Sequence, residues 1–598
     1  MNKETGILVF CLLAACAFPG GPQAEASETF GDITISPLAE SSVQYTHGYV
    51  AHRVRIVNRS HSRPHRVRLK APERSFLHGE SIDQLTRTVV VGAGSEALVS
   101  LPQPPMALNG NNKIAVYVDG RKEGVVIMPG LSQTYARHYR RENQTRIFVS
   151  RTVKIDDLRL ELGIEKKRRS GSSYRDESKH ILVRAESETS EWPQNWLGYS
   201  CYDGVVISAH DKLPPAVWTA LRRYVEAGGT LVIPGEFSLT KEWAEHEVFS
   251  ATGMQVCYPG FGVCIILPSG KASGISAKQA SRIKREWMRT LQPWNNVMET
   301  DVGGAQRDFR VMEELNVPVR GYFFIMLGFA IVIGPVNYAL LAWRKRKIWL
   351  LWTVPALSLF ACAAVYLYAL LEEGITPRVR QGSLTLLDQS NQHAATMGQF
   401  ACYCPLTPAE GLHFSHTTEV TPLVERDRYR GGGTAHSVDW SRDQHLKRGW
   451  VAARVPAHFV IRKAGPRRER LVVNDETDKG LSALNGLGAP IEKMWISNKD
   501  GRIYSAEQVE PGAGFVAAPA PDLGAASADA LTWRRMYGRK GLWKGTYSSV
   551  TNKPAAFLRP SSYIAVLAEN PFMEEGLQGR KELEGRAVVV GFLKETEE

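Results

Sequence analysis

The fold is decided by two long apolar runs: Gly321–Trp343, which reads GYFFIMLGFAIVIGPVNYALLAW, and Ile348–Leu371, which reads IWLLWTVPALSLFACAAVYLYALL. Neither run contains a charged residue, and only Arg344-Lys345-Arg346-Lys347 separates them. A helix needs about 20 apolar residues to cross a hydrocarbon core about 30 Å thick. Because a backbone in lipid must satisfy its own hydrogen bonds, each run should be helical. The sequence therefore predicts transmembrane helices at 321–343 and 348–371, joined as a hairpin.

The residues that flank the hairpin predict its orientation. Basic residues collect on the cytoplasmic side of membrane proteins, so the Arg-Lys-Arg-Lys turn is expected in the cytoplasm. Trp343, Trp349 and Trp352 lie near that turn and Tyr322 lies at the other end, where interfacial aromatic belts are found. Both polar arms are then expected on the opposite side of the membrane. The competing interpretation, two buried helices of a soluble domain, is disfavoured by the length of the uncharged runs.

Three residues within the runs have local roles. Pro335 and Pro355 are expected to disturb the helices, since proline lacks a backbone N–H. Asn337 is the one strongly polar side chain, and we expect it to join the two helices rather than to serve transport.

The N-terminus resembles an export signal. An apolar stretch from Gly6 to Phe18 precedes Ala24-Glu25-Ala26, which predicts a signal peptide of residues 1–26 with cleavage after Ala26. Leu13-Ala14-Ala15-Cys16 resembles a bacterial lipobox, so lipidation at Cys16 is an alternative, and an uncleaved anchor is another. Each of these exports the first arm, in agreement with the orientation of the hairpin.

Export and charge limit the partners. The formal charge of +12 is distributed over many loops, and in an exported protein we expect no nucleic acid. The expected location is the bacterial inner membrane with both arms periplasmic. The expected partners are the lipid bilayer and membrane or periplasmic proteins, and the oligomeric state stays open.

The first arm divides into two predicted domains. Residues 27–140 contain short alternating stretches such as Tyr49–Val57 and Arg66–Leu69, separated by turn residues, which predict a β-sandwich. Residues 145–300 have a different pattern. Gly204–Ser208 is a continuous apolar strand, Pro215 begins a helix, Gly228-Gly229 ends it, and Thr230–Gly235 is another apolar strand. Strand, helix and strand predict a βαβ unit with a parallel sheet.

The two segments that carry this unit, YDGVVIS at 202–208 and LRRYVEAGGTLV at 221–232, resemble the class I glutamine amidotransferase-like fold. They are most similar to its degenerate form in uncharacterised exported bacterial membrane proteins. Similar domains occur in ThuA-like proteins and in the periplasmic parts of accessory proteins of gliding-motility-type ABC transporters. The resemblance covers about 40 residues and implies a fold more than a function.

The amidotransferase resemblance does not extend to the reaction. That family carries a catalytic cysteine in a G-x-C-x-G elbow with His and Glu partners. Here Cys264 lies within an apolar strand, Val263–Leu267, and Cys201 precedes its strand. The sequence therefore predicts no catalytic residue, no cofactor and no metal.

Four polar residues follow the predicted parallel strands. Ser208, His210 and Asp211 come at the end of the first strand, and Glu236 follows the second. Parallel sheets bind ligands at this edge, which makes the four candidate ligand-binding residues. Neighbours on one chain seldom reach the geometry of a catalytic triad, so turn or cap duty is the alternative, with Asp211 as a helix cap.

Two exported cysteines are placed for a disulfide. Cys257 and Cys264 flank the turn-rich stretch Tyr258–Gly262 between two apolar runs. They are candidates to bridge the strands of a hairpin, and free buried cysteines are the alternative.

The second arm, 375–598, has many strand patterns and predicts one or two β-sandwiches. Cys402, Cys404, His413, His416 and Glu419 would need an unseen turn to form a metal site, so core cysteines and exposed histidines are expected.

The expected fold is multidomain, α/β plus all-β. A periplasmic β-sandwich and an amidotransferase-like α/β domain precede the transmembrane hairpin, and a C-terminal β-sandwich region follows it. The expected function is that of a non-enzymatic inner-membrane scaffold or sensor that binds partner proteins or envelope ligands. One alternative is an accessory subunit of an ABC-type complex, whose ATPase would be another protein because the chain has no Walker motif. The other is a periplasmic hydrolase that uses the α/β crevice.

Overall fold

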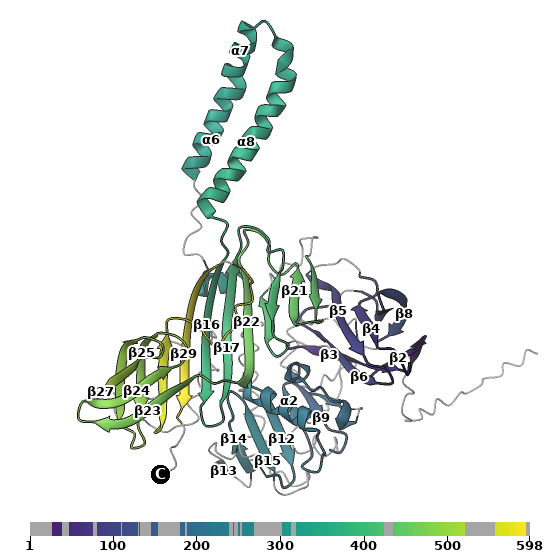
Figure 1. Ribbon diagram of the computed structural model, residues 1–598, viewed down its shortest axis with the longest axis vertical. Helices are drawn as coiled ribbons and strands as arrows, with labels where there is room; N and C mark the ends of the chain where they lie inside the picture. The colour runs from purple at the N-terminus through teal and green to yellow at the C-terminus, as the bar shows by residue number, and fades with distance from the viewer. Residues whose placement is uncertain are drawn as a thin grey trace, which may run out of the picture.

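The computed structural model describes residues 27–38, 47–75, 80–108, 110–128, 131, 145–153, 180–185, 188–238, 243, 249–251, 254–267, 302–311, 319–423, 434–520, 557–579 and 581–593. The predicted signal peptide, with Ala26 and Cys16, lies outside these residues, as does 268–300 of the predicted α/β domain. The described chain is mixed α/β, mostly strands, with two long apolar helices (Figure 1).

The first arm begins with two sheets that share one hydrophobic core. Every second residue of a strand points to the same face, and in one strand Val67, Leu69 and Ala71 are buried while the residues between them are more exposed. This alternation gives each sheet one face that points into the core. The smaller sheet has the order β1-β2-β3-β6: β1 (Glu28–Phe30), β2 (Ile33–Pro37), β3 (Val50–Asn58) and β6 (Glu96–Gln103). The first arm contributes four strands to the larger sheet: β4 (His65–Ala71), β5 (Ser81–Val91), β7 (Lys113–Val118) and β8 (Arg121–Ile127).

The larger sheet is completed by strands from beyond the apolar helices. Its order is β18-β21-β20-β5-β4-β7-β8, with β18 (Leu412–Phe414), β20 (Ala435–Asp439) and β21 (Gln444–Arg448). Strand β20 runs parallel to β5, and Val438 lies opposite Leu85. The sequence interpretation, in which 27–140 and 375–598 form separate β domains, misses this pairing.

The α/β part has a seven-stranded sheet with the order β10-β9-β11-β12-β15-β14-β13. Its first five strands in that order are mutually parallel, and β14 and β13 are antiparallel additions. The elements are β9 (Thr145–Val149), β10 (His180–Arg184), η1 (Thr189–Glu191), η2 (Trp196–Tyr199), β11 (Gly204–Val206), α2 (Pro215–Glu226), β12 (Thr230–Pro234), β13 (Phe249–Ala251), β14 (Met254–Cys257) and β15 (Val263–Leu267).

The βαβ unit β11-α2-β12 is present, as the sequence predicts. Pro215 occupies the first turn of α2, where its missing N–H costs nothing. Val217, Leu221 and Val225 are buried on one face of the helix. Gly228 follows with φ +112°, a conformation that favours glycine and turns the chain into β12.

The rest of the second arm forms an eleven-stranded sheet with the order β19-β22-β17-β16-β29-β28-β25-β26-β27-β24-β23. Strand β27 pairs with both β26 and β24, so the far end of the sheet folds over and shares a core with β25, β28 and β29. The short helix α5 (Val302–Asp308) contacts β22. The strands are β16 (Arg378–Asp388), β17 (His393–Tyr403), β19 (Glu419–Leu423), β22 (Ala457–Pro466), β23 (Arg470–Thr477), β24 (Gly480–Gly486), β25 (Ile491–Ser497), β26 (Ile503–Val509), β27 (Gly514–Pro519), β28 (Ser562–Leu567) and β29 (Glu582–Phe592).

The two apolar runs form long helices that lie side by side and project from the body of strands (Figure 1). The first comprises α6 (Val319–Ile331), a π-helical turn η4 (Val332–Val336) and α7 (Asn337–Trp343); after η5 (Lys347–Trp349), α8 (Leu350–Glu373) runs back. The π turn contains Pro335, which has no backbone N–H to donate and whose ring clashes with the carbonyl one turn earlier in a regular α-helix. Asn337 Nδ2 donates to Thr353 Oγ1 at 3.0 Å, so it joins the helices as expected.

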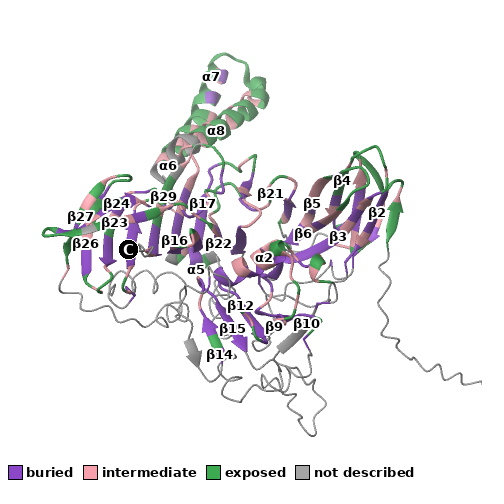
Figure 2. Ribbon diagram, turned by 60° about the horizontal axis from the view of Figure 1, so that its bottom comes forward, coloured by how far each residue is buried: buried purple, intermediate pink, exposed green. Residues whose placement is uncertain are grey.

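The surface of this helix pair differs from the rest of the protein. Its segments Gly321–Trp343 and Lys347–Tyr368 are long and apolar enough to cross a membrane, the first being about 35 Å long at 1.5 Å per residue. Large apolar side chains face outward along both helices, including Trp343, 84% exposed, and Leu359, 75% exposed. Figure 2 shows these exposed helices against the buried strands of the body.

Candidate functional site

The carboxyl ends of β9, β11 and β12 bring together part of the predicted ligand-binding set. Asp211 accepts a hydrogen bond from the backbone N–H of Ser208 at 2.9 Å through one carboxylate oxygen. Its other oxygen accepts from the hydroxyl of Thr152 at 2.6 Å. Asp211 therefore ties the turn after β11 to the turn after β9. The sequence interpretation missed Thr152, although it also follows a parallel strand at this edge.

The remaining predicted residues of this edge point to solvent. His210 is exposed, and its backbone N–H donates to Ser208 Oγ at 3.2 Å. Glu236 is also exposed, beyond the end of β12. Ser208, His210 and Asp211 thus form a hydrogen-bonded turn in which the Asp211 carboxylate contacts backbone and hydroxyl groups. This arrangement differs from a catalytic relay, in which a carboxylate orients an imidazole toward a nucleophile.

The candidate disulfide residues lie directly opposite each other. Cys257 on β14 and Cys264 on β15 are register partners, both buried, and both are free thiols. Burial raises the pKa of Cys257 to about 12 and that of Cys264 well above its usual range. Both thiols are therefore protonated at neutral pH and lack the thiolate that nucleophilic chemistry needs.

The five residues of the second arm that the sequence analysis considered as a metal site do not come together as one group. Cys402 and Cys404 lie in the core, and Glu419 binds Arg462. Among the described residues, one His/Asp group has the spacing for a metal ion, formed by His413 with Asp443 and His445.

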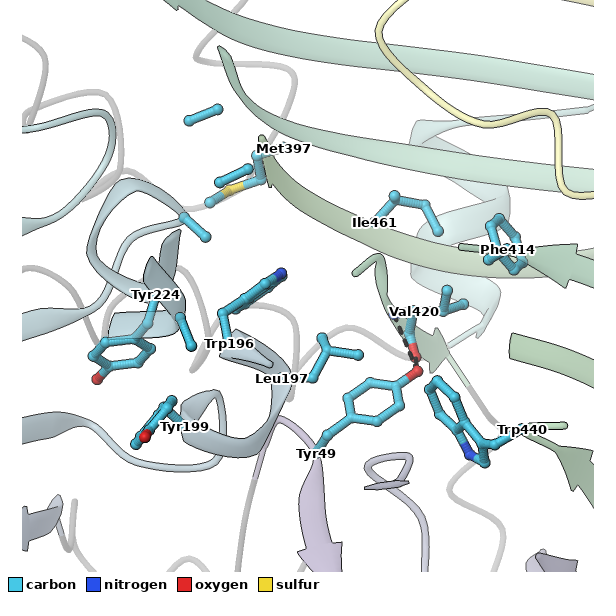
Figure 3. Close-up of a cluster of buried hydrophobic side chains, with 14 of the residues drawn as sticks. Tyr49, Trp196, Leu197, Tyr199, Tyr224, Met397, Phe414, Val420, Trp440 and Ile461 are labelled. Atoms are coloured by element: carbon cyan, nitrogen blue, oxygen red, sulfur yellow. Dashed lines mark hydrogen bonds between the residues drawn. The ribbon is translucent and has the colours of Figure 1, made fainter. Parts of the chain in front are cut away.

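The most extensive network of buried contacts is a junction where three parts of the body meet: the β-sheets of the first arm, the α/β part and the second arm (Figure 3). The side chain of Tyr49, the residue before β3, is fully buried against the second arm. Its hydroxyl donates to the Val420 carbonyl at 3.0 Å and accepts from Val420 N–H at 3.2 Å and from Gln444 Nε2 at 2.6 Å. Its ring packs edge-on against Trp440, with centroids 6.1 Å apart.

The α/β part enters this junction through η2. The indole N–H of Trp196 donates to the Thr417 carbonyl at 2.7 Å, and Asn195 Nδ2 donates to the His416 carbonyl at 2.7 Å. Both bonds join residues that are more than 200 positions apart in the chain. Figure 3 shows Trp196 and Leu197 between the aromatic residues of the α/β part and the strands of the second arm.

A buried ion pair lies at the centre of the junction. Arg462 on β22 donates to Glu419 Oε2 on β19 from Nη2 at 2.6 Å and from Nε at 3.1 Å. Side-chain exposure is 2% for the arginine and 0% for the glutamate. Arg462 Nη1 also donates to the carbonyl of Ala227 at 3.1 Å, and its guanidinium lies 5.2 Å from the centroid of the Trp196 ring. One arginine therefore links the second arm to the end of α2.

A second buried pair joins the first two parts of the body. His47 Nε2 lies 2.6 Å from Asp203 Oδ1, and His47 Nδ1 lies 3.0 Å from the Ser200 carbonyl. Asp203 Oδ2 accepts from the backbone N–H of Arg146 at 2.6 Å. Polar groups buried this completely are stable only with partners, and here those partners lie on different parts of the fold.

The sequence offers one hint of the ion pair, because Arg462 is a charged residue directly after the apolar run Phe459–Ile461. Nothing in the sequence identifies Glu419 as its partner.

Comparisons with known proteins add little to this geometry. No protein-family model matches the chain, and no curated protein matches it either. A solved structure of the yeast delta-COP-I mu-homology domain complexed with a Dsl1 WxWxV peptide aligns with 36% of this chain and 96% of its own. The identity is 7% and the TM-score is 0.16, a similarity that carries no argument about fold or function.

Proposed function

We propose that the protein is a membrane-anchored scaffold whose two arms form one body on the periplasmic face of a bacterial inner membrane. The exposed apolar surface of α6–α8 supports insertion in lipid, because an apolar surface of this extent is rare on a soluble monomer. The basic turn at Arg344–Lys347 supports a cytoplasmic position for the tip of the hairpin.

The observation that carries this proposal is the pairing of β20 with β5 across the hairpin. Strands that share hydrogen bonds must lie on the same side of a membrane, so both arms emerge together. One aromatic contact supports the same arrangement: Tyr322 and Tyr368, near opposite ends of the hairpin sequence, pack edge-on with ring centroids 5.6 Å apart.

A scaffold role agrees with the way in which polar groups are used. Arg462 of the buried ion pair, Tyr49 and the His47–Asp203 pair all make hydrogen bonds between parts of the body. Cys257 and Cys264 are buried and protonated, and Asp211 is engaged in two turns. A body whose parts are joined in this way is suited to present surfaces to partner proteins or envelope ligands.

The orientation is tested by labelling single cysteines. Arg121 in the first arm, Lys345 in the turn and Lys499 in the second arm are exposed, and each is replaced by cysteine in a Cys362→Ala parent. The parent alone gives the background. With a membrane-impermeant maleimide on cells whose outer membrane is permeabilised, Arg121→Cys and Lys499→Cys should label before lysis. Lys345→Cys should label only after lysis, and labelling of the two arms on opposite sides would overturn the proposal.

The scaffold role is tested by purification from gently solubilised membranes. A stoichiometric protein partner should be retained, and it should remain in Asp211→Ala and Glu236→Ala variants. A membrane ATPase as that partner would make the chain an accessory subunit. If no partner is retained and the two substitutions abolish the cellular phenotype while the fold persists, the crevice is a site of enzymatic action and the scaffold proposal fails.

A further inference from the structure

Two histidines face each other at the edge of the seven-stranded sheet that joins the arms. His413 on β18 and His445 on β21 are direct register partners. Their imidazole rings stack, with centroids 3.9 Å apart and planes inclined by 23°. Asp443, two residues before His445, places a carboxylate oxygen 2.7 Å from His413 Nδ1. One nitrogen from each ring and one Asp443 oxygen all lie within 4.8 Å of one another.

The hydrogen bonds around the rings leave nitrogen lone pairs available. His445 Nε2 lies 2.6 Å from the Glu410 carbonyl, an acceptor, so this nitrogen carries the proton and Nδ1 keeps its lone pair in the neutral ring. His413 Nε2 is buried and has no hydrogen-bond partner among the described residues. The Glu410 carbonyl thus holds the His445 ring from behind, the arrangement that orients histidines bound to metals.

The neighbouring histidine is used differently. His416, spaced by three from His413, stacks on the ring of Trp440 with centroids 5.8 Å apart, and its carbonyl accepts from Asn195. It therefore contributes to the junction between the parts of the body, whereas the described side-chain hydrogen bonds of His413 and His445 go to Asp443 and to the Glu410 carbonyl.

We propose that His413, Asp443 and His445 bind one divalent transition-metal ion of the zinc class. Zinc is about 2.0 to 2.2 Å from nitrogen and oxygen ligands, so tetrahedral ligands lie roughly 3.3 Å apart. The candidate ligand atoms of the three residues lie within 4.8 Å of one another. Because β18 and β21 are already paired, rotation of the side chains is enough to bring these atoms to the ligand spacing. Imidazole and carboxylate together suit Zn²⁺ or Co²⁺, whereas Ca²⁺ and Mg²⁺ prefer oxygen ligands alone. The ion would fasten the three-residue edge strand β18 to β21, with one coordination position left for water.

The test uses the full-length protein in detergent micelles, without an affinity tag and after treatment with chelator. Co²⁺ should bind with one equivalent and give the visible d–d absorption of a tetrahedral site, and Zn²⁺ should displace it. His413→Gln and His445→Gln should each weaken Zn²⁺ binding, measured by calorimetry, by at least about 100-fold. Asp443→Asn should weaken it by about 10- to 100-fold, because the substitution removes the negative charge from the ligand set.

The matched control is His65→Gln. His65 also lies on a strand, and its Nδ1 is 2.7 Å from Asp119 Oδ2, so a general effect of losing a strand histidine would appear there too. This variant should bind Zn²⁺ as the parent does. Thermal unfolding provides a second measurement, because a ligand of the folded state raises the unfolding temperature: Zn²⁺ should raise it in the parent and the control but not in the His413 and His445 variants. Absence of saturable one-to-one binding in the parent, or equal affinity in the ligand variants, would overturn the proposal.

Discussion

Removal of Arg462 should damage the body more than removal of any surface charge. Replacing it by methionine keeps much of the side-chain volume but leaves Glu419, which is 0% exposed, without its cation. Breaking a buried ion pair on one side costs about 3 to 5 kcal/mol. The substitution also removes the bond to the Ala227 carbonyl and the contact with Trp196, so the upper part of that range is expected.

The effect is measured as thermal unfolding of the full-length protein in micelles, followed by tryptophan fluorescence. At about 2 °C per kcal/mol for a large domain, the unfolding temperature of Arg462→Met should fall by about 8 to 10 °C. The control is Lys493→Met. Lys493 Nζ lies 2.8 Å from Glu507 Oε1, but the two side chains are 48% and 60% exposed. An exposed pair contributes about 0 to 1 kcal/mol, so the control should shift by no more than about 2 °C.

The double substitution Arg462→Met with Glu419→Leu provides the strictest test. Replacing both partners of a buried pair by apolar residues removes the unpaired charge, so the double variant should be more stable than either single variant. If the losses of the two single variants simply add, the ion pair does not hold this junction and the reasoning is refuted.

The loss in Arg462→Met should also depend on pH. Burial raises the pKa of Glu419, and the neighbouring Arg462 opposes that rise. Without the arginine, the folded-state pKa is displaced further above the ordinary value of 4.5. A carboxyl whose pKa is higher in the folded state loses stability as the pH rises from its unfolded value through its folded value. The difference from the parent should therefore be larger at about pH 8 than at about pH 5.

Three further outcomes are expected. Tyr49→Phe removes a hydroxyl with three buried partners and should cost about 1 to 3 kcal/mol, seen as a lower unfolding temperature with membrane insertion unchanged. Gly262→Ala would place a Cβ 2.0 Å from a carbonyl oxygen at the end of α2, so the α/β part should become sensitive to limited proteolysis. Burial acts to raise the pKa of Glu574, but the charge of Lys463 together with hydrogen bonds from Lys463, Thr418 and Ser415 lowers the pKa overall. Stability from that carboxylate is present above its unfolded pKa and lost as the pH falls through the folded value, so Lys463→Met should flatten the loss of unfolding temperature on acidification.

Several features followed from the sequence because their signals are local. The two uncharged runs at 321–343 and 348–371 predicted long apolar helices, since composition and length alone determine whether a segment can span a membrane. The prolines at the start of α2 and Gly228 at its end predicted the βαβ unit, because each residue type fits the backbone conformation of its position. The chain order also placed Ser208 and Asp211 at one edge of the sheet.

Tertiary structure alone decided how the arms combine. A strand pattern states which face is buried but not which strand lies beside it, so the pairing of β20 with β5 had no signal in either segment. The same limit applies to Arg462 and Glu419, which are buried charges only because strands β19 and β22 adjoin and α2 covers them. His413 and His445 likewise became neighbours through the register of β18 and β21. The sequence determined the elements and the hairpin, whereas the shared sheets, the buried ion pair and the histidine pair depend on contacts between residues far apart in the chain.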